Sequence, residues 1–196
     1  GTGSSDFSVS DHFVPAEFTF DNQQPPRRGG PLYRLGIPGF VANEHPAFSL
    51  GVGRRALDTI ADIAQSKRRG LAQPSGLATR AVFQRDLGEC DLRLRAARAL
   101  LEEISEQAWR KVCAGDTPTV RLQAEMRSAA VFGMEAGLDV VTRSFRYAGG
   151  TAVYLTHVLQ RCLRDVNTAA QHLMVSNSAY ENYGKCLLGL PADPMG

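Results

Sequence analysis

The sequence predicts a mainly α-helical protein, in which an up-and-down four-helix bundle follows a few short β-strands. In four long segments between residues 47 and 190, apolar residues recur at every third or fourth position, which is the period of one helix face. Only short connections separate the last three segments, and short connections join antiparallel neighbours in a bundle. The hydrophobic content of 43% is sufficient for a buried core.

Residues 1–20 show the alternation that is typical of short strands. Phe7 and Val9 alternate with polar neighbours, and so do Phe18 and Phe20. Two or three strands leave their edges unpaired, so we expect their pairing partners to lie in sequence that is not present here. The chain also begins without an initiator methionine. We therefore interpret this segment as the remnant of a β-domain in a fragment of a longer protein.

The rest of the chain divides into a linker, a bundle and a tail. Residues 21–46 are rich in Pro and Gly, which predicts a linker with one helical turn. The bundle is expected at residues 47–190 and the tail at 191–196. Its four helices are predicted near residues 50–69, 77–114, 117–140 and 152–188, the last as one continuous helix of roughly 50 Å.

Local signals mark some of the helix ends. The basic residues 67–69 stand directly before Gly70, and basic side chains followed by glycine are typical of a helix C-terminus. Thr117 is expected to cap the third helix, with Pro118 in its first turn.

Composition excludes several classes of partner. The net charge is only +2 and the charges are interspersed, so neither a nucleic acid nor an anionic membrane is predicted to bind. We find no signal peptide and no apolar run that could span a bilayer. The cysteines show no metal-type spacing, and Cys90 and Cys162 fall on apolar stripes, which favours reduced, buried thiols and a cytoplasmic location. The histidines lack zinc-ligand spacing, and no metal site is predicted.

Two interpretations of the residues Gly149, Gly150 and Thr151 stay open. Glycines can end a helix and a threonine can cap the next one, which would make this corner purely structural. A helix start also directs bare backbone N–H groups outward, and Arg143 and Arg146 precede it, so the same corner is suited to holding a phosphate.

A polar row lies beside the apolar stripe of the last helical segment. It contains Arg161, Asp165, Thr168 and His172, at spacings that keep them on one side of a helix. Arg161 and Asp165 fit a simple ion pair at positions i and i+4. A histidine at the edge of an apolar seam is either a structural group bonded to a carbonyl or a group with a chemical role.

Two segments resemble the acyl-CoA dehydrogenase superfamily. GTGSSDFSVSDHFVP at the start is similar to the end of its middle β-domain. RYAGGTAVYLTHVLQRCLRDVNTAAQH resembles the aromatic-Gly-Gly and Leu-x-Arg-x-x-Arg-Asp segment of its C-terminal four-helix bundle. The resemblance spans nearly the whole chain. It implies FAD or FMN at an interface of a homodimer or homotetramer, with Arg146, Gly149, Gly150 and Thr151 near the flavin phosphates or ribityl chain.

The position of His172 indicates the branch of the superfamily. Many acyl-CoA dehydrogenases carry a catalytic glutamate shortly after the Arg-Asp pair, whereas this chain has Gln171, His172 and Leu173 there. It resembles the flavin-dependent two-component monooxygenases, in which a separate reductase supplies reduced flavin and a C4a-hydroperoxide hydroxylates an aromatic or other apolar substrate. Imidazole, with an ordinary pKa of about 6.5, suits His172 to take a phenolic proton or orient the hydroxyl. Arg161 and Asp165 would support the site or contact another subunit.

Two other functions remain open at this point. The first is an acyl-CoA dehydrogenase that forms an α,β-double bond with FAD and an acyl-CoA substrate, with its base on another helix, such as Glu44. The second is a non-catalytic helical module that serves only oligomerisation.

Overall fold

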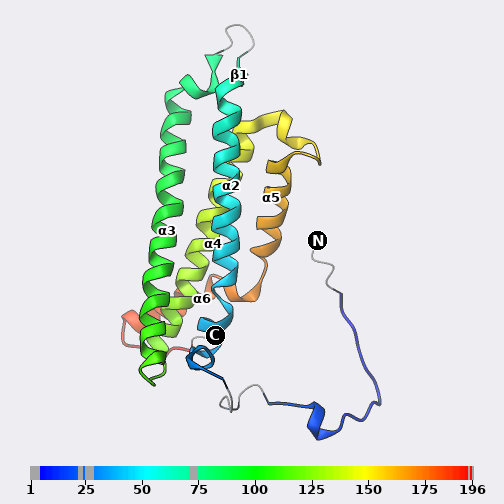
Figure 1. Cartoon of the computed structure of the whole chain (residues 1–196), viewed down its shortest axis with the longest axis vertical. Coiled ribbons are helices and arrows are strands. Elements are labelled where there is room, and N and C mark those ends of the chain that lie inside the picture. The colour runs from blue at the N-terminus through cyan, green and yellow to red at the C-terminus, as the bar shows by residue number, and fades with distance from the viewer. Residues whose placement is uncertain (1–4, 22–23, 25–28, 71–74, 194, 196) are drawn as a thin grey trace.

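The computed structural model describes residues 5–21, 24, 29–70, 75–193 and 195. Its body is a bundle of four helices that run alternately up and down, α2 (Glu44–Ser66), α3 (Ala81–Cys113), α4 (Val120–Ala148) and α5 (Val158–Ala169) (Figure 1). Helix α6 (Ser178–Leu187) packs against one end of α4. The architecture confirms the predicted mainly α-helical four-helix bundle.

Short elements connect these helices. Helix α1 (Gly36–Val41) precedes α2, and a two-stranded antiparallel hairpin, β1 (Arg68–Arg69) and β2 (Ser75–Gly76), follows it. Five 3-10 turns complete the described structure: η1 (Ala16–Phe18), η2 (Pro31–Arg34), η3 (Leu77–Thr79), η4 (Gly149–Val153) and η5 (Leu173–Val175). In the part of the chain that the structure describes, no helix is long and apolar enough to cross a membrane.

Helix α4 is the centre of the bundle, and its contact with α2 is unusually close. A Cβ atom at Gly137 would overlap the side chain and carbonyl of Ser49 on α2, and one at Gly53 would lie 3.2 Å from the Cα of Gly137. Ser49 is fully buried, and its hydroxyl donates to the carbonyl of Met134 at 2.9 Å. Small residues therefore let the two backbones meet, and the buried hydroxyl of Ser49 is satisfied.

The core extends along this contact on both sides. Cys90 on α3 and Cys162 on α5 are buried among its apolar side chains as free thiols, which confirms the placement of both cysteines on core stripes. Burial raises the pKa of both thiols, so they remain protonated at neutral pH.

The predicted strands within residues 1–20 are wrong for the described part of that segment. Residues 5–21 form no strand, and their regular structure is limited to the turn η1. The side chains of Phe7 and Phe20 are 90% and 89% exposed. A strand requires a hydrogen-bonded neighbour, and no other described segment pairs with these residues, so alternation alone does not produce a sheet.

The predicted single helix over residues 152–188 is also wrong. It is divided into α5, η5 and α6 because His172 and Ser176 have extended backbones, with ψ angles of 138° and 143°. In addition, α5 begins at Val158 rather than near Ala152, because His157 caps it. Polar side chains that bond the neighbouring backbone compete with a continuous helix, and two of them do so here.

The ends of other helices are shifted by a few residues. Helix α2 begins at Glu44, within the segment predicted as linker. Thr119, rather than Thr117, caps α4, and its hydroxyl accepts from the backbone N–H of Leu122 at 3.2 Å. The basic segment at the end of α2 does end the helix, since the backbone of Lys67 is extended.

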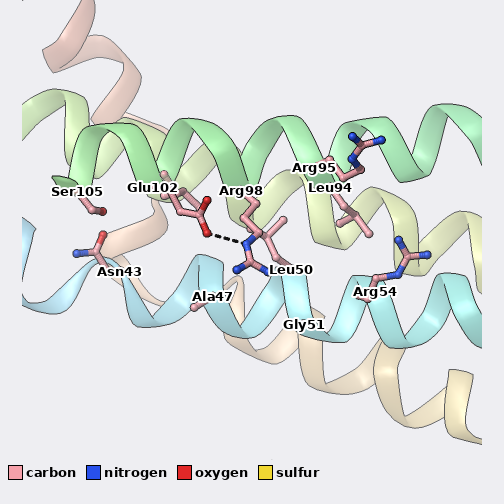
Figure 2. A pocket seen from close by; sticks show the side chains of 11 residues that line it. Asn43, Ala47, Leu50, Gly51, Arg54, Leu94, Arg95, Arg98, Glu102 and Ser105 are labelled. Atoms are coloured by element: carbon pink, nitrogen blue, oxygen red, sulfur yellow. Dashed lines mark hydrogen bonds and ion pairs between the residues drawn. The ribbon is translucent and has the colours of Figure 1, made fainter. Parts of the chain in front are cut away.

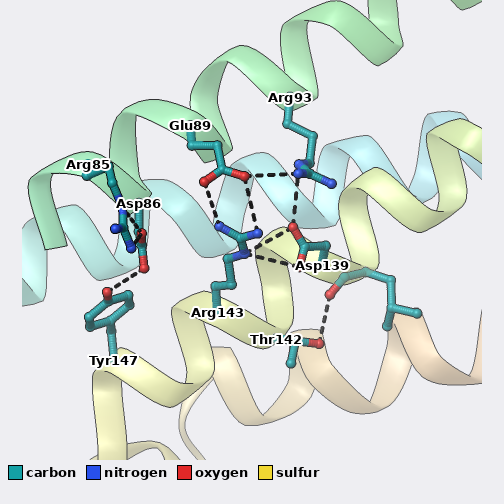
Figure 3. Close-up of polar contacts among 9 residues, drawn as sticks. Arg85, Asp86, Glu89, Arg93, Asp139, Thr142, Arg143 and Tyr147 are labelled. Carbon is teal, nitrogen blue, oxygen red and sulfur yellow. Dashed lines mark hydrogen bonds and ion pairs between the residues drawn. The ribbon is translucent and has the colours of Figure 1, made fainter. Parts of the chain in front are cut away.

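An ion cluster joins α3 to α4 on the surface (Figure 3). Arg143 donates through both terminal nitrogens to the two carboxylate oxygens of Glu89, at 3.1 and 3.2 Å, and its Nε donates to Asp139 at 3.1 Å. Arg93 contacts both acids from the other side. The hydrogen bonds from Arg143 are the main cause that lowers the pKa of Glu89. The guanidinium of Arg143 is thus bound to carboxylates of this cluster, although the sequence had suggested a role for Arg143 in binding phosphate near Gly149 and Gly150.

The close α2–α4 contact yields a prediction for stability. Gly137→Ala should destabilise the protein by about 2 to 3 kcal/mol, because the added methyl group forces two backbones apart. Gly88→Ala is the matched control: Gly88 is exposed on α3 with open space at its Cβ position, and alanine there should stabilise by roughly 0.5 to 1 kcal/mol. Urea unfolding of both variants measures the difference, and equal effects would contradict the close contact.

The ion cluster yields a prediction for pH dependence. A carboxyl whose pKa is lowered by folding contributes stability that is present above its ordinary pKa and is lost as the pH falls through the lowered value. For Glu89 the ordinary value is 4.5. Arg143→Met should therefore lower the urea midpoint at neutral pH, and its difference from wild type should shrink as the pH falls below that value.

Arg110→Met is the control for this experiment. Arg110 makes only an exposed pair with Glu106, at 4.0 Å within one helix, and such pairs contribute little. Its urea midpoint should stay close to that of wild type at every pH. A difference for Arg143→Met that did not change with pH would show that the lost packing, rather than the lost ion pairs, causes the destabilisation.

Candidate functional site

The site residues expected from the sequence gather at opposite ends of α5. Gly149, Gly150 and Thr151 lie just before this helix, and His172 lies just after it. Twelve helical residues separate the two ends by roughly 18 Å. The structure thus brings the expected cofactor residues together but holds the expected catalytic histidine apart from them within one chain.

His172 begins a turn that is anchored from both sides. Its Nδ1 accepts from the backbone N–H of Met174 at 3.3 Å, which makes it the N-cap of η5. The side chains of Met174 and Val175 are buried. Arg127, a buried residue of α4, donates through Nη2 to the carbonyl of Leu173 at 3.1 Å. The backbone that carries the imidazole is therefore fixed to the centre of the bundle.

The cap also determines which ring nitrogen is free for a substrate. An Nδ1 atom that accepts a hydrogen bond carries no proton, so a neutral His172 holds its proton on Nε2. In this arrangement the ring can donate from Nε2.

A second imidazole lies against the first. The ring centroids of His45 and His172 are 4.2 Å apart, with 34° between the ring planes. His45 stands in the first turn of α2, and its side chain is 13% exposed. Burial lowers the pKa of His45, and the neighbouring His172 lowers it further. We call these two residues the imidazole pair.

The sequence did not predict the imidazole pair, since the histidines were tested there only for zinc-ligand spacing. The two histidines lie in the first and last helical parts of the bundle, and no spacing rule connects residues so far apart. Glu44, the candidate base of the dehydrogenase alternative, is the immediate neighbour of the pair. Its Oε1 lies 3.8 Å from Nδ1 of His45, and its side chain is 73% exposed.

The glycine corner ends α4 as predicted. Gly149 has a φ of +62°, which favours glycine, and its N–H donates to the carbonyl of Phe145. The expected cap of the next helix by Thr151 is wrong, because a 3-10 turn follows and His157 caps α5, its Nδ1 accepting from the N–H of Leu159 at 3.2 Å. Thr151 is exposed instead, with its hydroxyl 3.4 Å from Nζ of Lys67.

Two basic residues accompany this corner. Arg146 is exposed on the last turn of α4, and Lys67 approaches from the end of α2. A Cβ atom at Gly150 would meet nothing within 4 Å, so the backbone of this residue is open to a ligand. An exposed glycine backbone, a hydroxyl and two cations are groups that bind phosphate.

The other expected pair is an ordinary surface interaction. Arg161 Nε and Asp165 Oδ2 are 3.3 Å apart at positions i and i+4 of α5, which confirms the predicted ion pair. Arg161 is exposed, so the pair contributes little to stability.

An open groove of about 590 Å³ runs between α2 and α3, and the sequence analysis did not anticipate it (Figure 2). Its floor is apolar, with Leu50, Leu94 and Leu101. Its arginines are already paired: Arg98 with Glu102 at 2.8 Å, and Arg54 with Asp91 at 2.6 Å. None of the expected site residues lines this groove.

The comparison with protein families identifies residues 44–177 as an acyl-CoA dehydrogenase, C-terminal domain. An indole-3-acetate monooxygenase of Pseudomonas putida is 30% identical over 96% of this chain and 48% of its own length. A pigment production hydroxylase of Rhodococcus sp. is 26% identical over 100% of this chain and 52% of its own. The chain thus spans about half the length of the curated relatives it matches.

Solved structures show the same fold. XiaF from Streptomyces sp., in complex with FADH2 and glycerol, has a TM-score of 0.77 and 21% identity, and the match covers 86% of this chain and 42% of XiaF. A 3-HSA hydroxylase from Rhodococcus sp. RHA1 has a TM-score of 0.75 and 20% identity. This match covers 87% of this chain and 43% of the hydroxylase. With the family match over most of the bundle, the chain belongs to the acyl-CoA dehydrogenase superfamily and contains its C-terminal domain.

Proposed function

We propose that this chain is part of a flavin-dependent monooxygenase that hydroxylates an aromatic or other apolar substrate. The observation that carries the proposal is His172, an imidazole that caps η5 beside a backbone held by Arg127. By the sequence resemblance, it stands where many dehydrogenases of the superfamily hold a catalytic glutamate. The names of the relatives, monooxygenases and hydroxylases, support the same reaction class.

The residues at the glycine corner fit the phosphates of a flavin. We assign this role to Arg146, Gly150 and Thr151, with Lys67 as an additional cation, while Gly149 shapes the turn and has its own N–H bonded within the helix. A bound reduced flavin supplies the activation of molecular oxygen. The FADH2 in the XiaF structure favours FAD over FMN.

His172 acts on the substrate rather than on the cofactor phosphates. Its Nδ1 is occupied by the cap, so Nε2–H is the group that meets the substrate. A hydrogen bond from Nε2 to a phenolic oxygen, or to another acceptor atom of the substrate, orients the substrate. Of the two roles expected for this histidine, the arrangement favours orientation over proton removal.

The superfamily resemblance supports the wider setting of the proposal. The glycine corner and His172 lie at opposite ends of α5, which fits a flavin site shared between subunits of a homodimer or homotetramer. A separate flavin reductase in the cytoplasm would supply the reduced flavin.

The acyl-CoA dehydrogenase remains the second candidate, because the carboxylate of Glu44 stands beside the imidazole pair. An anaerobic experiment distinguishes the dehydrogenase from the monooxygenase: an acyl-CoA is added, and the absorbance of the bound flavin near 450 nm shows whether the flavin is reduced. Bleaching by the acyl-CoA that disappears in Glu44→Gln would favour the dehydrogenase, whereas hydroxylation with NADH and a reductase favours the monooxygenase.

His172→Ala should lower hydroxylation of indole-3-acetate, used as the probe substrate, by about 100-fold, because loss of an orienting group that misplaces the substrate by about 1 Å can cost that factor. The protein should be produced from its complete coding sequence, and flavin affinity should stay unchanged. Hydroxylation at the wild-type rate would contradict the role of His172.

Arg146→Met and Lys67→Met should each weaken flavin binding by about tenfold, since one charge-assisted hydrogen bond contributes about 1.5 kcal/mol. Fluorescence titration measures the flavin Kd. Arg110→Met, which removes an exposed cation in the last turn of α3, is the matched control and should bind flavin as wild type does. Equal affinities in all three variants would exclude the glycine corner as the phosphate site.

A further inference from the structure

We infer that His45 is a positioning residue that holds the imidazole of His172 in its capping orientation, an inference that rests on the proposed function. The imidazole pair joins two elements that are far apart in the sequence, the first turn of α2 and the start of η5. The ring centroids lie 4.2 Å apart with the ring planes tilted by 34°, which is direct contact.

The cap alone does not fix the ring of His172. The last torsion of a histidine side chain is broad and two-fold, so the ring can turn about it at small cost. The hydrogen bond to Met174 is long, at 3.3 Å, and the residue is otherwise exposed. A second ring against its face removes this freedom, because rotation would drive the imidazole into His45. The contact thus limits rotation of the ring, and the cap selects the orientation in which Nδ1 faces Met174 and Nε2 faces outward.

His45 is suited to this task because its own position is rigid and its charge is small. It sits on a long helix, one turn before the buried Ser49 that fastens α2 to α4. Two cationic imidazoles at this distance would repel each other. Burial lowers the pKa of His45, which favours the neutral form of its ring in this contact.

Among the residues that the structure describes, few charged groups lie near the imidazole pair. On α2, Glu44 lies 3.8 Å from Nδ1 of His45. On α4, Arg127 donates to Leu173 beside His172, and Asp193 near the C-terminus acts electrostatically on Arg127. Arg127 and Asp193 offset each other, and the exposed Glu44 is largely solvated. The positioning effect therefore depends on contact rather than on a strong local field.

The test is a pair of variants in the flavin-free protein produced from its complete coding sequence, with histidine labelled by nitrogen-15. His45→Gln keeps polarity and approximate size but removes the ring, whereas His45→Phe keeps an aromatic ring without nitrogens. In wild type, the ring signals of His172 should show an unprotonated Nδ1 and a protonated Nε2. His45→Gln should shift them toward a mixture of both tautomers, and His45→Phe should restore the wild-type pattern.

His157→Ala is the matched control, because His157 also caps a helix through Nδ1 but lies at the other end of α5 without a neighbouring imidazole. It should leave the signals of His172 unchanged. Unchanged His172 signals in a folded His45→Gln protein, or equal shifts in His45→Gln and His45→Phe, would overturn the inference. Circular dichroism shows whether each variant is folded. If His45→Gln is not folded, the nitrogen signals of His172 in His45→Phe decide the question.

Activity separates this inference from the proposed function. With indole-3-acetate as the probe, His45→Gln should lower kcat about tenfold or more with a small change in KM, since misplacement of a catalytic group by about 1 Å can cost as much as 100-fold. His45→Phe should recover most of kcat. If the nitrogen signals behave as expected but no variant or wild-type protein hydroxylates an aromatic probe, His45 positions His172 and the proposed function is wrong.

Discussion

The close approach of α2 to α4 is the constraint on which the rest of the structure depends. Gly137 on α4 leaves room for the backbone at Ser49, and the hydroxyl of Ser49 bonds across to Met134. His45 precedes Ser49 by one helical turn, so whatever fixes Ser49 also fixes the direction of His45. The turn with His172 is tied to the same helix α4 through Arg127. Both halves of the imidazole pair are thus positioned by one helix.

Helix α5 divides the functional groups rather than uniting them. An imidazole caps its start at His157, and another imidazole begins the turn that follows its end. The basic glycine corner belongs to the first of these ends and the imidazole pair to the second. Because a helix is rigid along its axis, the two ends of α5 stay roughly 18 Å apart within one chain.

Periodicity predicted α2, α3 and α4. Helices α2 and α3 each bury one stripe, whereas the central helix α4 buries side chains around most of its circumference. Periodicity failed for residues 152–188, where the stripe of α5 happens to continue in register through η5 into α6. The interruption comes from single side chains, chiefly His157 and His172, that bond the backbone two residues ahead. It failed also for Phe7 and Phe20, because a strand depends on a partner that periodicity does not contain. The imidazole pair depends on tertiary contact alone and leaves no local signal.

The chemistry of the site follows from what a capped imidazole can do. A glutamate at this place accepts a proton with either of two equivalent oxygens, which suits removal of a proton from carbon. A histidine whose Nδ1 is engaged by Met174 has one remaining nitrogen, and that nitrogen carries a hydrogen. Such a ring is a fixed donor with one direction. It can orient an electron-rich substrate toward an oxidant without removing a proton from the substrate. Hydroxylation of an aromatic ring requires such orientation.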